Sequence, residues 1–167
     1  GSMNKTLLLT LTMSAILFSQ ESKLTKAPDL TFDLLGGKKA TLSELVKNGP
    51  VVIDFWATWC EPCKKEMVHL EKIYKKYKDQ GLTVLAISQD SPRSLSKVKS
   101  YIRSKQYTFT VGLDPNQQVG MKFNAKVLPT TIIIDQNMNI MSTHQGYIPG
   151  DEKKLEEEIV ALLKNEE

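Results

Sequence analysis

One stretch of the chain decides the fold: Val51-Val52-Ile53-Asp54-Phe55-Trp56-Ala57-Thr58-Trp59-Cys60-Glu61-Pro62-Cys63. Its first six residues are almost all apolar, which is typical of a strand buried on both faces of a sheet. After Glu61, apolar residues recur at spacings of three and four as far as Tyr77, which indicates a helix with one apolar face. The sequence therefore predicts a buried strand that leads into a helix, with Cys60 where the helix begins.

The position of Cys60 favours redox chemistry. Free N–H groups and the helix dipole stabilise an anion at a helix start, and the thiolate is the nucleophilic form of cysteine. Cys63 lies one turn further and can attack a mixed disulfide formed at Cys60, which releases the reduced partner. Pro62 falls in the first turn, where its missing N–H is harmless. We therefore predict an attacking Cys60 and a resolving Cys63, with a pair of inert buried thiols as the alternative.

Two further residues are candidates for the same site. Asp54 interrupts the apolar strand, where burial is costly and raises the pKa of a carboxyl group. Such a group behind Cys63 could take and return its proton; the alternative is a side chain that reaches solvent or caps a helix. Pro129 follows Leu128 at the start of an apolar run, and a cis bond there would form a rigid turn. The backbone of Leu128 would then be free to pair with an incoming peptide.

The rest of the chain alternates strand and helix patterns. Strands are expected at 30–34, 82–88, 109–111, 130–134 and 140–144, and helices near 91–105, 114–123 and 151–163. Gly36-Gly37 is typical of a hairpin turn, and the last two strands form an antiparallel hairpin. This order predicts an α/β fold with a mixed sheet.

Composition and charge exclude several classes of protein. With 41% hydrophobic and 25% charged residues in 167, the chain suits one globular domain and is not disordered. The formal charge of +3 is too small and too dispersed for a nucleic-acid binder. The lysines between 64 and 78 alternate with Glu66, Glu71 and Asp79, which predicts a solvated helix face.

The N-terminus predicts export. Gly1 and Ser2 are typical of a scar left by tag removal, and Lys5 precedes an apolar stretch over 7–18. That stretch is too short for a spanning helix, which needs about 20 residues, and fits a secretory signal peptide. A buried or amphipathic helix is the alternative. We expect residues 1–28 to comprise scar, signal peptide and a polar linker over 21–27, and residues 29–167 to form one domain.

The strand, the Cys60-Glu61-Pro62-Cys63 motif and the later Leu128-Pro129-Thr130-Thr131 segment resemble the thioredoxin superfamily. The TlpA/ResA branch is the closer match. The resemblance implies a thioredoxin fold with a mixed central sheet, an N-terminal β-hairpin extension over 32–45 and a central helix–strand insertion.

The same resemblance implies a function. Members of this branch are thiol–disulfide oxidoreductases, and the resemblance implies that the chain needs no cofactor or metal. Its substrates would be disulfides of exported client proteins, for example in cytochrome c maturation. A membrane electron donor of the DsbD/CcdA type would recharge it in the periplasm or cell envelope.

The resemblance also implies roles for single residues. Pro129 is cis and shapes the groove for the partner, and Trp59 covers the dithiol. Partner contacts come from Trp59, Glu61, Pro62, Leu128 and Pro129. Some members have Asn at the position of Asp54 and use an acid in a later loop, where this chain has Asp90. A helix N-cap before Pro92 is the alternative role for Asp90.

Other functions stay open at this point. A peroxiredoxin-like peroxidase would use one cysteine in a Thr-x-x-Cys context, whereas Thr58 lies only two residues before Cys60. A Sco-like copper-binding assembly factor would need a wider cysteine spacing, with soft ligands from His144 and Met138 or Met141. Glu61 places a negative charge beside Cys60, which disfavours the thiolate and hence a strongly oxidising protein.

Overall fold

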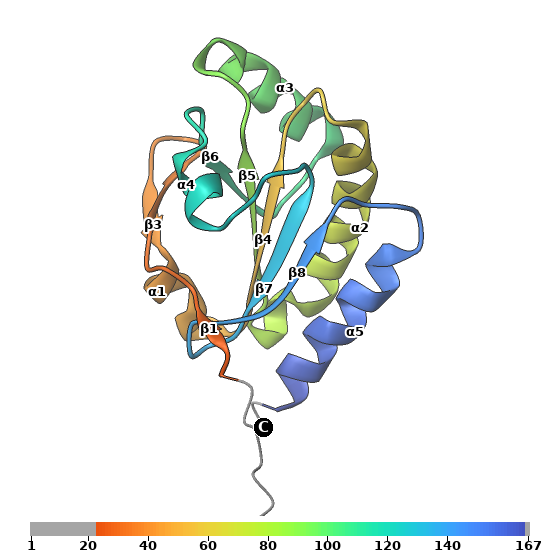
Figure 1. The fold of residues 1–167 in the computed structure, drawn as a ribbon. Helices are drawn as coiled ribbons and strands as arrows, with labels where there is room; N and C mark the ends of the chain where they lie inside the picture. The colour runs from red at the N-terminus through yellow and green to blue at the C-terminus, as the bar shows by residue number, and fades with distance from the viewer. Residues whose placement is uncertain (1–22, 166–167) are drawn as a thin grey trace, which may run out of the picture.

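The computed structural model describes residues 23–165, so the predicted signal peptide lies outside the described residues. Within that range one eight-stranded sheet has the order β1-β8-β7-β4-β5-β6-β2-β3 (Figure 1). The strands are β1 Thr25–Lys26, β2 Thr31–Leu34, β3 Lys39–Thr41, β4 Val51–Trp56, β5 Thr83–Ser88, β6 Thr110–Leu113, β7 Thr130–Ile134 and β8 Asn139–Gln145. β4 pairs in parallel with β5 and antiparallel with β7, so the predicted mixed sheet is confirmed.

Helices cover both faces of this sheet. They are α1 Leu42–Leu45, α2 Glu61–Tyr77, α3 Leu95–Lys105, α4 Gln118–Lys122 and α5 Asp151–Lys164, with short 3₁₀ turns at Val46–Asn48, Lys78–Gln80 and Pro92–Ser94. Figure 1 shows α2 and α5 on one side of the sheet and α1 and α4 on the other. None of the helices in residues 23–165 is both long and apolar enough to cross a bilayer.

β4 is buried along its whole length because both of its faces are covered. Val52 and Trp56 pack with Leu70 of α2 and Ile159 of α5, while Phe55 belongs to a second core on the opposite face. Successive side chains of a strand point to opposite faces. Asp54, which lies between Val52 and Trp56 in this alternation, therefore faces α2.

The hairpin extension and the insertion meet at one edge of the sheet. β2 and β3 pair antiparallel on either side of Gly36 and Gly37, which both adopt positive φ. β2 also pairs with β6, the strand of the insertion, and β6 continues the sheet in parallel beside β5. Both sequence predictions are confirmed, and the insertion is the link between the hairpin and the central strands.

The linker interpretation of residues 21–27 is corrected at two positions. Thr25 and Lys26 pair with Ile140 and Asn139 and so form the short edge strand β1. The backbone N–H of Ala27 and the side chain of Lys26 donate hydrogen bonds to carbonyl groups of the β7–β8 turn. Two residues show too little periodicity to be recognised as a strand from the sequence.

Candidate active site

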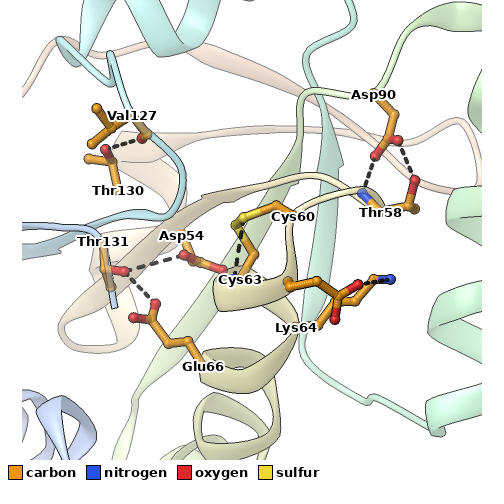
Figure 2. The surroundings of a disulfide bond; sticks show 11 residues. Asp54, Thr58, Cys60, Cys63, Lys64, Glu66, Asp90, Val127, Thr130 and Thr131 are labelled. Carbon is orange, nitrogen blue, oxygen red and sulfur yellow. Dashed lines mark hydrogen bonds and ion pairs between the residues drawn. A yellow bond between two sulfur atoms is a disulfide. The ribbon is translucent and has the colours of Figure 1, made fainter. Parts of the chain in front are cut away.

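The two cysteines lie at the first turn of α2, directly after β4. Cys60 is the N-cap residue, and a disulfide joins it to Cys63 (Figure 2). The backbone N–H of Cys63 donates a hydrogen bond to Sγ of Cys60 at 3.3 Å, and Pro62 occupies the turn between them. Cys60 is 6% exposed and Cys63 is fully buried, so a partner can reach only Cys60. A free N–H of the first helical turn thus points at the more accessible sulfur.

Asp54 belongs to a buried carboxyl pair. Figure 2 shows its side chain pointing from β4 toward the first turn of α2. The hydroxyl Oγ1 of Thr131 lies 3.3 Å from Oδ1 of Asp54 and 2.5 Å from Oε1 of Glu66. A hydroxyl has one hydrogen and cannot donate it to both acids at once. Both contacts are satisfied when one carboxyl group carries a proton and donates it to the hydroxyl, which donates its own hydrogen to the other acid.

Both acids of this pair are harder to ionise than usual. Burial, followed by the nearby charge of Glu66, raises the pKa of Asp54 well above 3.8. Burial also raises the pKa of Glu66 from 4.5, although the Thr131 hydroxyl and the distant charge of His144 oppose that shift. The pair can therefore hold a proton beside the dithiol and release it when the local charge changes.

Glu66 corrects the expectation of a wholly solvated helix face. It is buried, as is Glu71, which accepts hydrogen bonds from the backbone and hydroxyl of Thr108 and from the N–H of Phe109. A signal for Glu66 was present in the sequence, because it follows Cys63 by three residues and precedes Leu70 by four. That spacing places its side chain on the face of α2 that packs against the sheet.

Asp90 binds the active-site loop and does not cap a helix. Its carboxylate accepts hydrogen bonds from the backbone N–H of Thr58 at 2.9 Å, from the Thr58 hydroxyl at 2.5 Å and from the Ser88 hydroxyl at 2.8 Å. The N-cap residue of the following 3₁₀ turn is Ser91, which makes no side-chain cap. The N-cap alternative for Asp90 is therefore wrong, and the acid instead connects β5 to the loop that carries the dithiol.

Leu128 and Pro129 are joined by a cis peptide bond, as the resemblance implied. The loop is fixed by two hydrogen bonds, from the Thr130 hydroxyl to the carbonyl of Val127 and from the Gly146 N–H to the carbonyl of Pro129. Next to it lies a groove of about 640 Å³, lined by Trp59, Gln89, Gln117, Met121, Lys126 and Leu128 among others. Trp59 is 68% exposed, so it borders this groove from the solvent side.

Glu61 has a cationic partner on α2. Its carboxylate forms an ion pair with Nζ of Lys64 at 3.2 Å, one turn along α2, and its side chain is largely exposed. A solvent-exposed charge with an adjacent cation exerts a screened effect on its surroundings. The effect of Glu61 on the Cys60 thiolate is thus smaller than its position in the sequence suggests.

The residues considered for copper are spread over the β7–β8 hairpin. Nε2 of His144 lies 2.7 Å from Oε2 of Glu158, and Met138 packs against the second core. Within residues 23–165, no three side chains of the His, Cys, Asp and Glu types cluster closely enough to hold a metal. The copper interpretation gains no support from this geometry.

Comparison with known proteins gives the family. The AhpC/TSA family model matches residues 24–143. The chain belongs to the AhpC/TSA family of thioredoxin-like proteins. It is 32% identical over 141 residues to thiol-disulfide oxidoreductase ResA of Halalkalibacterium halodurans, and the match covers 84% of this chain and 77% of the relative. It is 33% identical to thioredoxin-like protein YneN of Bacillus subtilis, covering 72% and 70%.

The solved structures agree with this assignment. A Chlorobium tepidum protein described as a candidate DsbE-type thiol:disulfide interchange protein superposes with a TM-score of 0.77 at 32% identity. The superposition covers 84% of this chain and 97% of that one. The family and these relatives make the chain a thiol–disulfide oxidoreductase, as the sequence analysis predicted, and its fold is of the thioredoxin type.

Proposed function

We propose that the protein reduces disulfides of exported client proteins through Cys60 and Cys63, with Asp54 and Glu66 as proton carriers. The observation that carries this proposal is the carboxyl pair beside the first turn of α2, where Cys63 lies. Strong oxidants of this superfamily owe their potential to a stabilised reduced form. Negative charge on a buried acid next to Cys63 destabilises its thiolate, which favours a reductant.

The reaction proceeds in two exchanges. The Cys60 thiolate, with the N–H of Cys63 directed at its sulfur, attacks one sulfur of the client disulfide. A mixed disulfide forms, and the other client sulfur leaves as a thiolate that takes a proton. Cys63 then gives its proton to Asp54 and attacks Sγ of Cys60, which forms the enzyme disulfide and releases the second client thiolate. Two electrons pass from the dithiol to the client.

The proton that Cys63 gives up needs a route to solvent. Thr131 contacts both acids, so a proton accepted by Asp54 can be shared with Glu66 through one hydroxyl. Glu66 also lines a small crevice with His144 and Gly146, whereas Asp54 is fully buried. We propose Asp54 as the group that takes the proton of Cys63 and Glu66 as its outlet toward solvent.

The partner surface is the groove beside the dithiol. Trp59 and Leu128 border it, Pro129 and Pro62 fix the two loops that meet at Cys60, and Glu61 stands exposed at the helix start. An extended client segment can pair with the backbone of Leu128 while its disulfide lies over Cys60. Clients of this kind include apocytochromes c during their maturation. A membrane electron donor of the DsbD/CcdA type would reduce the enzyme again, outside the cytoplasm.

Trapping with a Cys63→Ser variant tests the division of labour. Mixed disulfides at Cys60 are expected to accumulate with envelope proteins, whereas Cys60→Ser should trap none. A reduction potential near about −270 mV supports a reductant, and a value near about −120 mV would make the protein an oxidant. Peroxide consumption by the isolated protein without a thiol partner would instead favour the peroxidase alternative.

The role of Asp54 has its own test. The Asp54→Asn variant should form mixed disulfides at the native rate but resolve them about 10²- to 10⁴-fold more slowly, since it lacks the base. The loss should be greatest between the raised pKa of Asp54 and the pKa of the Cys63 thiol, where the carboxylate is ionised and the thiol is not, and it should shrink at lower pH as Asp54 becomes protonated. Resolution at the native rate across the pH range would remove Asp54 from the mechanism.

A further inference from the structure

The insertion carries an unusual concentration of positive charge. Residues 91–113 contain Arg93, Lys97, Lys99, Arg103 and Lys105 and no Asp or Glu. All five side chains are exposed, and within residues 23–165 none of them forms an ion pair. We refer to these five residues as the basic face. Because the chain as a whole has a formal charge of +3, its other residues sum to −2, and the excess of positive charge lies on α3 and the 3₁₀ turn before it.

Three lysines of α2 differ in this respect. Lys64 and Lys76 pair with Glu61 and Glu156, and Lys75 lies 3.7 Å from Glu71. These pairs neutralise the local field, whereas like charges on α3 add to one another. Four of the five cations lie on α3, where like charges such as Lys99 and Arg103, four residues apart, repel one another. A negative partner would turn that repulsion into attraction.

The end of the basic face at Lys105 lies near the start of α2. Nζ of Lys105 is 5.9 Å from the centre of the Tyr101 ring, and Nζ of Lys64, the residue after Cys63, is 5.5 Å from the same centre. The Tyr101 ring also packs 5.6 Å from that of Trp56, at the end of β4. Figure 1 shows α3 at the same end of the molecule as the start of α2. A protein that presents a disulfide to Cys60 therefore comes close to the basic face.

The outer surface of α3 favours a protein partner over a lipid surface. Ser96, Ser100 and Ser104 follow one another at spacings of four, and all three are exposed. Helices that lie in a membrane interface bury a row of large apolar side chains, and this face has none. A lipid surface against α3 would also cover the dithiol that clients must reach.

We propose that the basic face is an electrostatic docking surface for disulfide clients whose surface is acidic next to the disulfide. This inference rests on the proposed reductase function and specifies its substrate class. Complementary charge raises the rate of encounter by about 10- to 10³-fold at low ionic strength, and salt removes this gain. The basic face would thus select among clients before any contact with the groove.

The test compares two synthetic peptides with the same internal disulfide, flanked either by glutamates or by glutamines. The reduced full chain is mixed with each peptide in a single turnover, so that no electron donor takes part. The measured quantity is the ratio of the second-order rate constants, glutamate peptide over glutamine peptide. We expect a ratio of about ten or more at low ionic strength that falls toward one at about 1 M salt, where the Debye length is about 3 Å.

Two charge-reversal variants locate the effect. Lys97→Glu/Lys99→Glu/Arg103→Glu should lower the ratio to one or below. Lys47→Glu/Lys78→Glu/Lys164→Glu changes the net charge equally, at exposed positions outside α3 and the dithiol loop, and should keep most of the native ratio. Equal losses in both variants would show that net charge alone acts and would overturn the proposal.

The remaining outcomes are also decisive. A native ratio near one at low salt would refute the basic face as a docking surface while leaving the reductase function intact. Failure to reduce either peptide would instead refute the proposed function itself. Binding of the native protein to vesicles with anionic headgroups, lost in the α3 variant and accompanied by a ratio of one, would assign the basic face to lipid and overturn the proposal.

Discussion

Replacing Asp54 with asparagine tests the buried carboxyl pair through stability as well as catalysis. Burial and the nearby Glu66 raise the pKa of Asp54 in the folded protein well above 3.8, its ordinary value in the unfolded chain. Between these two values the folded state keeps a proton that the unfolded state has lost. The stability contributed by this proton is fully present below the unfolded pKa and is lost as pH rises through the folded pKa.

The size of the effect follows from linkage and from the geometry of the pair. One proton held only by the folded state costs about 1.4 kcal/mol of unfolding free energy per pH unit within that window. The shared contact with Thr131 keeps the two carboxyl groups within about 6 Å of each other, where two negative charges repel by about 3 kcal/mol at an effective dielectric constant near 20. This repulsion is one part of the linkage cost, because it is among the causes of the raised pKa. Asparagine cannot ionise, so the whole cost disappears in the variant.

Urea unfolding of the oxidised protein at a series of pH values measures how the free energy of unfolding depends on pH. The native protein should lose stability as pH rises from about 4. Asp54→Asn should show a flatter curve and greater stability at neutral pH. Asp114→Asn is the matched control, because its buried carboxylate accepts hydrogen bonds from Gln89, Val119 and Gly120 and lies outside the pair. Parallel curves for native and Asp54→Asn would refute the reasoning.

Three other perturbations give separate tests. Asp90→Ala should cost about 1–3 kcal/mol by leaving the N–H and hydroxyl of Thr58 unpaired, and faster hydrogen exchange of the Thr58 amide would report it. Glu71→Gln should weaken the attachment of the insertion to α2 by a similar amount, seen as faster exchange of the Thr108 amide, whereas unchanged protection would contradict it. Trp59→Ala should raise KM for protein disulfides about tenfold but leave that for a small disulfide nearly unchanged, and equal changes would count against a partner contact.

The sequence was sufficient for the central part of the fold. The apolar run of β4 and the spacing of α2 depend on local periodicity, and both were predicted within one or two residues. The position of the cysteines followed from the same two patterns, because the strand end and the helix start coincide at Cys60. The short strand β1 was missed, since two residues form a strand only through their pairing with β8.

The polar residues of the site were predicted less completely. Asp54 stood out because it interrupts an apolar run, whereas Glu66 stands among lysines and resembles a surface residue. Its burial depends on how α2 rotates against the sheet, and its contact with Thr131 joins positions 65 residues apart. For Asp90 two roles were left open, because its bond to Thr58 also crosses between separate elements. Tertiary contacts of this kind leave little trace in local sequence patterns.

The burial of Cys63 affects how well the protein resists irreversible oxidation. Peroxide converts accessible thiolates through sulfenic acid to sulfinic and sulfonic acids, the last of which is irreversible. Cys63 is fully buried on the face of α2 that packs against the sheet, so small oxidants meet Cys60 first. A sulfenic acid at Cys60 lies one helical turn from Cys63, which can close the disulfide with loss of water before further oxygen is added. We therefore expect oxidation of Cys60 by peroxide to end at the Cys60–Cys63 disulfide. The electron donor that reduces this disulfide after each turnover would then also reverse the damage.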